Sequence, residues 1–516
     1  RIMINGSLTV DAPGLLANDT VIESDALTAF FPGEPQHGTL QGSADGSFTY
    51  QPDPGFEGID TFTYGANDGI NDSSNVATVS LIVSGLLHTL DNPTDNITPY
   101  GYFGNAVAVD GNYVLVGANQ NKLEGLSTYY NGEAYLFEAT TGSLLHSFAP
   151  PENLTDERYD DYGYSVDIEG TLIAIGAPDN ERYNTPDFFC GPGMVYLYDA
   201  ITGDLLRIIE DPTPSQDGQF GKSVALDGNQ ILIGNPGDDT NGQDAGQAYL
   251  FEVTTGSLLH ILDDPTPVAY DEFGEAVAID DGKILVSAPY DDTLAGNGGQ
   301  VYLFDAATGN LIHTLDDPTP RTYGYFGKSL DMDGNQILVG NAYGLYGGKA
   351  QHFDATTGQL VRTFNSPIES AYFGWSVAIQ DDIFVIGGPS FNTSQNVGQV
   401  YLYSAVSGDL IRTIDDPTST VLDNFGYSVA IDGEYVVIGA ARDDTLDTNV
   451  GQAHIYRYEF GQAPPVFNDQ AFSLAENSAV DTVVGTLTAS HPNDKSLTYT
   501  ISTYLDLDGD GHQAFR

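Results

Sequence analysis

Short apolar runs of four or five residues alternate with turn residues along most of this chain. Residues 273–320 show the pattern clearly, because Asp281-Gly282 and Thr308-Gly309 each separate two apolar runs. Asp-Gly pairs favour tight hairpins, and the branched and aromatic residues of the runs suit a pleated, half-buried surface. The pattern predicts four antiparallel strands, at Ala276–Ile279, Ile284–Ser287, Val301–Phe304 and Leu311–Leu315.

This four-strand unit recurs seven times, at intervals of 47 to 59 residues. Repeats of about 40–50 residues filled with short strands are typical of β-propellers, whose blades are four-stranded sheets. The predicted fold class is therefore all-β, with a seven-bladed β-propeller as its largest part. Each copy opens on an aromatic-glycine pair: Phe103-Gly104, Tyr162-Gly163, Phe220-Gly221, Phe273-Gly274, Phe326-Gly327, Phe373-Gly374 and Phe425-Gly426.

The two ends of the repeat array complement each other. The seventh copy runs through Gly451–Tyr458 and then lacks its last strand, whereas Ser84–Asn92, ahead of the first copy, is similar to the fourth-strand segment Gly309–Asp317. Pairing of that early segment with the last copy would leave no open sheet edge. We therefore predict a ring closed by an N-terminal strand.

The flanking residues predict further β-sandwiches. Short strands divided by Gly, Pro, Asn and Asp clusters fill residues 1–83, as in sandwich domains. The expected domains are a sandwich at 1–83, the propeller at 84–461 and an incomplete sandwich at 462–516. Because both ends interrupt a module, we expect the sequence to be a fragment of a larger secreted protein.

The charge balance narrows the possible partners. Lys and Arg total 16 against 72 Asp and Glu, a formal net charge of −56. Nucleic acids and anionic membrane surfaces are bound by cationic surfaces, so neither is an expected partner. The acidity instead favours cations as ligands, or serves as a solubilising surface in salty water. No apolar run approaches the roughly 18–20 residues that a membrane-spanning helix needs.

Residues 1–83 resemble the bacterial tandem immunoglobulin-like or cadherin-like modules of large surface adhesins. The motifs that carry the resemblance follow in the expected order: Asp11–Thr20, His37–Leu40, Asp45–Tyr50, Pro54–Gly58 and Asp60–Tyr64. Phe472–Tyr499 resembles the first half of a cadherin repeat, a family that binds calcium at domain junctions. The resemblance implies that Glu476 is a calcium ligand, although His491-Pro492-Asn493 stands where the family has an acidic pair.

The propeller repeats resemble the FG-GAP repeat of integrin-type propellers, with their Phe-Gly openings and strand ends such as Gly176–Pro178. Calcium-binding versions of that repeat carry an Asp-rich loop between the first two strands. Here the connection is a short Asp-Gly turn, as at Asp110-Gly111 and Asp333-Gly334. The usual calcium site of the family is therefore not expected.

Two other patterns are candidate calcium sites. Asp506–Gly511 places Asp506, Asp508 and Asp510 at alternate positions before a glycine, and such oxygens converge on a hard cation when the glycine allows a sharp turn. The alternative is a polar turn.

The second pattern is an Asp-Asp-Thr sequence in the long loop between strands two and three. A carboxylate pair with an acid or amide five residues on can ligate calcium. Equally, Asp and Asn are ordinary loop residues that bond their own backbone. The residues are Asp238, Asp239 and Asp244, Asp291, Asp292 and Asn297, and Asp443, Asp444 and Asn449.

Enzyme signatures such as Gly-x-Ser-x-Gly or His-Glu-x-x-His are absent from the sequence. We predict a non-enzymatic extracellular protein of a bacterial surface or matrix. In this hypothesis the propeller presents a rigid face to a glycan or protein or assembles into a filament or sheath, and calcium stiffens the flanking modules. The alternative is a secreted propeller hydrolase or lyase for polysaccharide or phosphate esters, using the divergent second and fifth copies.

Overall fold

The fold is all-β, with one short 3₁₀ helix, η1 (Gly14–Asn18), among the described residues. The computed structural model describes residues 2–3, 7–18, 27–53, 56, 58–67, 76–93, 100–120, 132–151, 161–179, 191–215, 218–342, 348–367, 372–389, 398–418, 423–445, 449–458, 466–467 and 489–490. The chain divides into two compact units, Gly85–Arg457 and a unit made of Arg1–Ser84 with Tyr458–Arg516.

Seven four-stranded antiparallel sheets make up the described part of the unit Gly85–Arg457. Six of them consist of four consecutive strands, and the seventh takes its outer strand from the start of the unit. The strands are β8 (Leu86–Asp91), β9 (Val107–Asp110), β10 (Tyr113–Ala118), β11 (Glu133–Glu138), β12 (Leu144–Phe148), β13 (Ser165–Glu169), β14 (Leu172–Ala177), β15 (Met194–Asp199), β16 (Leu205–Glu210), β17 (Ser223–Asp227), β18 (Gln230–Asn235), β19 (Gln247–Glu252), β20 (Ser257–Asp263), β21 (Val277–Asp280), β22 (Lys283–Ala288), β23 (Gln300–Asp305), β24 (Leu311–Asp316), β25 (Phe326–Asp333), β26 (Gln336–Asn341), β27 (Lys349–Asp354), β28 (Gln359–Asn365), β29 (Ser376–Gln380), β30 (Ile383–Gly388), β31 (Gln399–Ser404), β32 (Leu410–Asp415), β33 (Phe425–Asp432), β34 (Tyr435–Ala440) and β35 (Gln452–Arg457).

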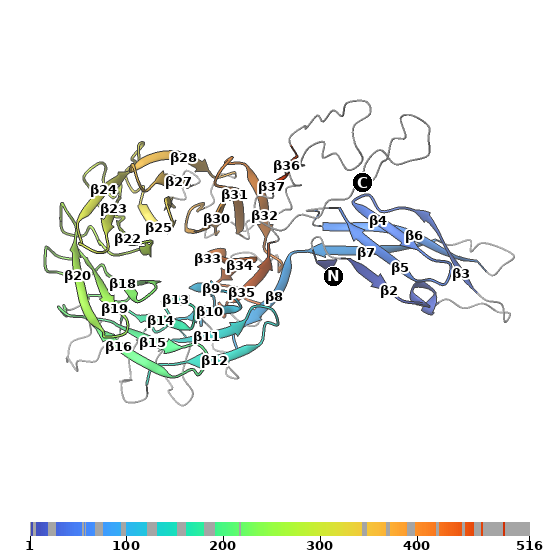
Figure 1. Cartoon of the computed structure of the whole chain (residues 1–516), viewed down its shortest axis with the longest axis horizontal. Helices are drawn as coiled ribbons and strands as arrows, with labels where there is room; N and C mark the ends of the chain where they lie inside the picture. The colour runs from blue at the N-terminus through green and yellow to red at the C-terminus, as the bar shows by residue number, and fades with distance from the viewer. Residues whose placement is uncertain are drawn as a thin grey trace, which may run out of the picture. The chain divides into compact units, whose positions relative to one another are not determined.

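The sheets follow one another around a centre (Figure 1). Their first strands are neighbours in a cycle: β9 contacts β13, the contacts continue through β17, β21, β25 and β29 to β33, and β33 contacts β9. The four strands predicted in the fourth copy are β21 to β24, and each predicted end lies within one residue of the observed one. Apolar runs and Asp-Gly turns therefore located these strands correctly.

Strand β8 completes the last sheet, whose order is β33-β34-β35-β8. Its residues pair antiparallel with β35, in a register that places Asp91 opposite Gln452 and Leu90 opposite Ala453. Leu86 and Leu90 are buried in this sheet. The predicted pairing of the early segment with the last copy is therefore present.

The aromatic residue that opens each repeat lies in a core between two consecutive sheets. Phe273 has no exposed surface and packs against Tyr302 and Phe304 of its own sheet, with ring centroids 5.7 and 6.2 Å apart. The same core includes Leu232 and Leu250 of the preceding sheet. Burial of these apolar groups between sheets is the main force that joins one sheet to the next.

The glycine that follows each aromatic residue allows close contact between neighbouring sheets. Gly104 has φ +87°, and its carbonyl oxygen would lie 2.0 Å from a Cβ placed on Gly439 in β34. The hydroxyl of Ser428 donates a hydrogen bond to the same carbonyl at 2.8 Å. A side chain at either glycine would push the sheets apart, which explains why six of the seven repeats carry glycine at both positions. The fourth repeat has Ser287 at the second of them.

The described residues of Arg1–Ser84 form two sheets, ordered β1-β7-β6-β3 and β2-β5-β4. Phe48 and Tyr50 of one sheet pack with Phe62, Leu81 and Val83 of the other, so the core lies between the sheets as in a sandwich. The strands are β1 (Ile2–Met3), β2 (Leu8–Val10), β3 (Thr28–Gly33), β4 (Gly38–Gly42), β5 (Phe48–Pro52), β6 (Gly58–Asn67) and β7 (Ala77–Ser84).

Two short strands are described after residue 458. They are β36 (Val466–Phe467) and β37 (Ala489–Ser490), which pair antiparallel. Across the described residues, no helix has both the length and the apolar character that a membrane span requires.

Candidate metal centre

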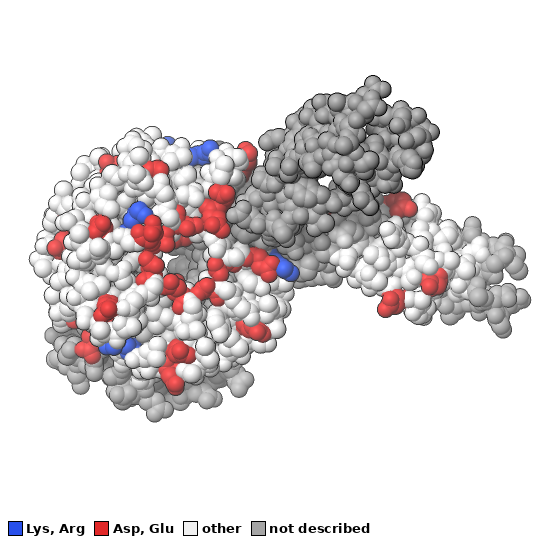
Figure 2. Space-filling view, in the orientation of Figure 1, with Lys and Arg blue, Asp and Glu red and all other residues white. Residues whose placement is uncertain are grey.

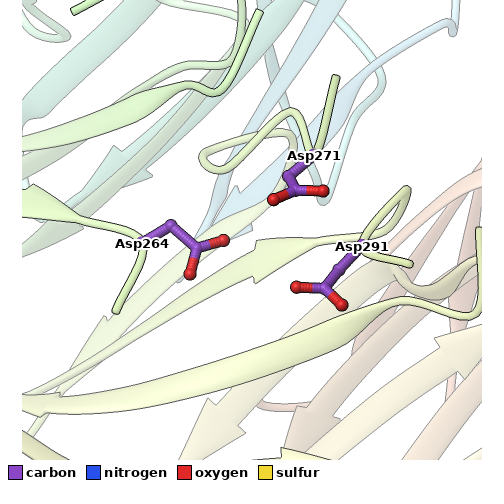
Figure 3. A group of neighbouring side chains, drawn as sticks. All are labelled: Asp264, Asp271 and Asp291. Carbon is purple, nitrogen blue, oxygen red and sulfur yellow. The ribbon is translucent and has the colours of Figure 1, made fainter. Parts of the chain in front are cut away.

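Three buried carboxylates meet at one edge of the fourth sheet (Figure 3). Asp264 follows β20 in the linker to the next sheet, Asp271 precedes the aromatic-glycine pair, and Asp291 begins the loop after β22. Their side chains are 3%, 2% and 1% exposed. One oxygen of each lies within 4.8 Å of the others, which is close enough for a single cation to contact all three.

Each carboxylate is held by a backbone amide of its own turn. Asp264 accepts a hydrogen bond from the Thr266 amide at 2.7 Å, and Asp291 accepts one from the Thr293 amide at 2.7 Å. Asp271 accepts one from the Val268 amide at 2.7 Å. These are tight local turns of the kind that Asp favours, and they fix where each carboxylate points.

One buried oxygen of this group has no hydrogen-bond donor, and another has only a distant one. The Oδ2 atom of Asp264 has no hydrogen-bond partner among the described residues. The Tyr302 hydroxyl is 3.5 Å from Asp291 Oδ2 and donates to Gln300 Oε1 at 2.9 Å instead. A buried carboxylate without a donor is costly unless a proton or a cation compensates it.

The pKa values reflect the same shortage of positive charge. Burial raises the pKa of Asp271 to about 7, and the charges of Asp291 and Asp264 contribute to the rise. Burial also raises the pKa of Asp264. Hard divalent cations such as calcium are ligated by carboxylate oxygens, so the residues present fit a calcium ion.

The fifth sheet supplies an internal comparison, because a lysine ammonium occupies the equivalent place there. Asp317 corresponds to Asp264 in the Asp-Pro-Thr linker, and Lys349 corresponds to Gln300 as the first residue of the third strand. The Lys349 Nζ atom lies 2.7 Å from Asp317 Oδ1. The position corresponding to Asp271 is Gly324. In the fifth sheet, the Lys349 ammonium therefore supplies the positive charge that compensates the Asp317 carboxylate.

Lys349→Gln should therefore destabilise the protein, because it removes the cation from a carboxylate that is only 1% exposed. Breaking a buried ion pair by removing one partner costs about 3–5 kcal/mol. Thermal unfolding of the variant measures the loss. Lys283→Gln is the matched control, since its partner Asp281 is 78% exposed and such pairs contribute little. Equal melting temperatures for the two variants would contradict the assigned role of Lys349.

A related acidic group lies in the seventh sheet. Asp416, Asp423 and Asp443 are all buried, and the Thr418 hydroxyl lies 2.6, 3.4 and 3.1 Å from one oxygen of each. A hydroxyl donates only one hydrogen bond, so it cannot satisfy three carboxylates. The Oδ2 atom of Asp416 has no hydrogen-bond partner among the residues that the structure describes.

The third sheet carries part of the same arrangement. Asp211 and Asp238 are buried, and the Thr213 hydroxyl lies 3.4 and 3.3 Å from one oxygen of each. Burial raises the pKa of Asp211 to about 6. The position that corresponds to Asp271 in this copy is Gly218, and the neighbouring Asp217 lies outside the described residues.

The second aspartate of each Asp-Asp-Thr sequence is placed differently from the first. Asp239, Asp292 and Asp444 are exposed, and each accepts a hydrogen bond from the backbone amide five residues on. The donors are Asp244, Asn297 and Asn449, with φ of 49°, 51° and 50°, a conformation that Asp and Asn tolerate. Among the predicted loop ligands, the first aspartate of each sequence, Asp238, Asp291 or Asp443, thus belongs to a buried acidic group. The second aspartate and the residue five positions on form a hydrogen-bonded turn at the surface instead.

Sequence reasoning did not single out Asp264 and Asp271. By sequence alone, the Asp-Asp-Pro-Thr-Pro linker is most simply a stiff crossover between strands, whereas in the structure the carboxylate of Asp264 lies within 4.8 Å of two other acids. The available signal was a second acid seven residues on, at Asp271 and again at Asp423 after Asp416. The other predicted ligands, Glu476, Asp506, Asp508 and Asp510, lie outside the described residues.

Acidic side chains also gather around the hollow at the centre of the ring (Figure 2). Carboxylates at the ends of first strands accept hydrogen bonds from the turn of a neighbouring sheet: Asp432 from the Gly111 amide at 2.6 Å, Glu169 from the Gly228 amide at 2.7 Å and Asp280 from the Gly334 amide at 2.5 Å. These acids link consecutive hairpins, so their positions have a structural explanation.

Comparison with protein families identifies two modules in the chain. Residues 2–85 match the family described as a bacterial cadherin-like domain. Residues 96–137, 213–251, 266–304 and 419–456 match the FG-GAP repeat. Both resemblances seen in the sequence are confirmed, whereas the cadherin-like character of residues 462–516 stays a prediction. A search of curated proteins finds no match to the chain.

Proposed function

We propose that this chain is part of an extracellular bacterial surface or matrix protein that acts in adhesion or assembly. The single observation that supports it best is the presence of a bacterial cadherin-like domain and FG-GAP repeats in one chain. Both families are typical of extracellular adhesion or scaffold proteins. The net charge of −56 suits such an environment and argues against nucleic acid as a partner.

The seven sheets act in this proposal as a seven-bladed β-propeller, closed by β8 and serving as a rigid unit that binds a glycan or protein or forms a scaffold. The cycle of neighbouring first strands supports this interpretation, as does the pairing of β8 with β35. Cores shared by consecutive sheets make the ring stiff. A stiff ring holds its loops in fixed positions, which suits recognition without catalysis.

Calcium is the proposed ligand of the buried acidic groups. An ion at Asp264, Asp271 and Asp291 would join the linker before the fourth sheet to a loop within it, and an ion at Asp416, Asp423 and Asp443 would do the same at the last sheet. Its role is structural: it neutralises acids that burial otherwise penalises. Calcium binding in the flanking cadherin-like modules, through Glu476, Asp506, Asp508 and Asp510, remains part of the same proposal.

Beads coated with the whole chain test the adhesive role. The proposal predicts that coated beads aggregate with one another, or bind to extracellular polymer from bacterial cultures, in millimolar calcium. Excess chelator should reverse the effect, while beads coated with a neutral control protein stay dispersed. Coated beads that remain dispersed and bind no polymer in calcium would contradict the adhesive role.

A further inference from the structure

Three tyrosine rings follow one another at the junction of the fourth and fifth sheets. Tyr290 lies in the loop after β22, and Tyr323 and Tyr325 lie in the linker before β25. The ring centroids of Tyr290 and Tyr325 are 5.2 Å apart, and those of Tyr325 and Tyr323 are 6.3 Å apart. Tyr323 is 50% exposed, whereas the other two are half-buried. We call these three residues the tyrosine row, which begins inside the junction and ends in solvent.

The backbone fixes the outer part of the tyrosine row. The amides of Tyr323 and Tyr325 donate hydrogen bonds to the carbonyl oxygens of Gly296 and Asn297, at 2.6 and 3.1 Å. Both tyrosines have positive φ, 61° and 53°, which is unfavourable for a bulky residue and persists only where the surrounding contacts enforce it. The linker therefore holds these side chains at fixed positions, which lowers the entropy that is lost when a ligand binds.

The fold does not require tyrosine at the exposed end of the row. Position 323 stands three residues before the aromatic residue that opens the fifth copy, and the third, sixth and seventh copies have Asp217, Ser370 and Leu422 at the equivalent position. Positions that serve the fold carry the same kind of residue in every copy, as the aromatic-glycine pair does. Exposed apolar groups gathered at one place mark interaction sites, so the tyrosine row is a candidate binding surface.

The chemistry of the tyrosine row suits a sugar chain. A tyrosine ring has apolar faces and a polar hydroxyl, and a sugar ring has C–H bonds on its faces and hydroxyl groups around its edge. Polar side chains accompany the rings, because Thr322 is exposed next to Tyr323 and the half-buried Asn297 accepts the Tyr325 amide. The surface thus combines stacking faces with hydrogen-bonding groups.

Charge and geometry narrow the class of ligand. The net charge of −56 repels acidic polymers, and tyrosine rings bring no positive charge to offset that repulsion. Proline-rich peptides also bind aromatic residues, but they dock in grooves lined by aromatic rings. The rings here stand in a single row, tilted by 68° and 43° relative to one another. An uncharged sugar chain fits these features better than either alternative.

We propose that the tyrosine row binds an uncharged extracellular polysaccharide, with Tyr323 as its main contact. One sugar ring stacks on the Tyr323 ring, and its hydroxyl groups bond to Thr322 and Asn297. This inference rests on the proposed adhesive function, and it names both the class of ligand and the surface that binds it.

Surface plasmon resonance of the whole chain over immobilised dextran, mannan, xylan and galactan tests the proposal, in millimolar calcium as in the bead assay. Immobilised poly-L-proline is the comparison surface. We expect binding to at least one of the polysaccharides and weaker binding to poly-L-proline. Tyr323→Ala should weaken the polysaccharide binding by about tenfold, because a few aromatic anchors carry most of the affinity of such contacts.

Tyr270→Ala is the matched control. Tyr270 occupies the equivalent position of the fourth copy, is 54% exposed and has φ 73°. Unlike Tyr323, it has no aromatic ring contact among the residues that the structure describes. The control variant should therefore bind like the unmodified chain. Thermal unfolding shows whether each variant is folded, and both substitutions are at exposed positions, where loss of folding is not expected.

Three results would overturn the proposal: no binding to any of the polysaccharides, equal affinity of the Tyr323 and Tyr270 variants, or tighter binding to poly-L-proline. If beads coated with the unmodified chain still aggregate or bind polymer in those cases, the adhesive function stands and only the assignment of the tyrosine row fails. If the beads also stay dispersed and bind no polymer, both are wrong.

Discussion

Replacing Leu86–Asp91 with a Gly-Ser segment of equal length is expected to cause the largest loss of stability in this chain. The change removes all of β8, and with it the outer strand of the last sheet and the antiparallel ladder from Asp91 to Leu86. It also removes Leu86 and Leu90, which are 7% and 3% exposed. Truncating one buried leucine costs about 2–5 kcal/mol, so losing two together with a whole ladder should unfold the last sheet at ordinary temperature.

Single substitutions give a graded form of this experiment. Leu90→Ala should lower the free energy of unfolding by about 2–5 kcal/mol, whereas Leu410→Ala, at a position that is 47% exposed, should change it little. Thermal unfolding and limited proteolysis both report the effect, and cleavage of the seventh repeat should appear first. A Gly-Ser variant that melts like the unmodified chain would show that β8 does not hold the ring together.

Calcium is expected to give the second-largest effect, as a rise in melting temperature. A ligand that binds only the folded state, at 100 times its dissociation constant, adds about 2.7 kcal/mol, which corresponds to a rise of roughly 3 °C for a unit the size of Gly85–Arg457. Asp291→Asn should abolish the part of the rise due to the fourth sheet, because Asp291 is buried among the three carboxylates. Asp292→Asn, at the exposed neighbouring position, should keep it.

The calcium effect should also grow with pH. Without metal, the pKa of Asp271 in the folded protein is about 7, against an ordinary value of 3.8. A group with a raised folded-state pKa contributes its full stability below about pH 4 and loses it as pH rises through 7. Calcium binds the deprotonated carboxylate of Asp271 and so restores the stability that deprotonation removes. The rise in melting temperature should therefore be larger at pH 8 than at pH 5.5, and a rise that is equal at both would argue against these carboxylates.

The sequence predicted the strands well because their pattern is local. An apolar run next to an Asp-Gly turn defines a strand without reference to the rest of the chain, as at Ile284–Ser287, which lies within β22. The pairing of β8 was also accessible, because the early segment repeats the pattern of other fourth strands. Both predictions rest on periodicity rather than on knowledge of the three-dimensional arrangement.

The acidic groups were only partly accessible from the sequence. Asp291 could be singled out in its loop, but Asp264 and Asp271 lie 27 and 20 residues before it, and three separate turns bring them together. The exposure of Asp292 depends on the turn that its carboxylate makes with the Asn297 amide. The role of Lys349 could not be predicted either, because its partner Asp317 lies 32 residues earlier along the chain and only the fold brings the two together.

The most direct test of the proposed cation sites is to count bound calcium by equilibrium dialysis of the whole chain at pH 8. We compare the unmodified chain with Asp291→Asn, Asp443→Asn and the control Asp292→Asn, so that any sites in the flanking modules cancel. The account predicts that each of the first two variants binds one calcium ion fewer per chain and that the control binds as many as the unmodified chain. An unchanged count in both Asp291→Asn and Asp443→Asn would contradict it.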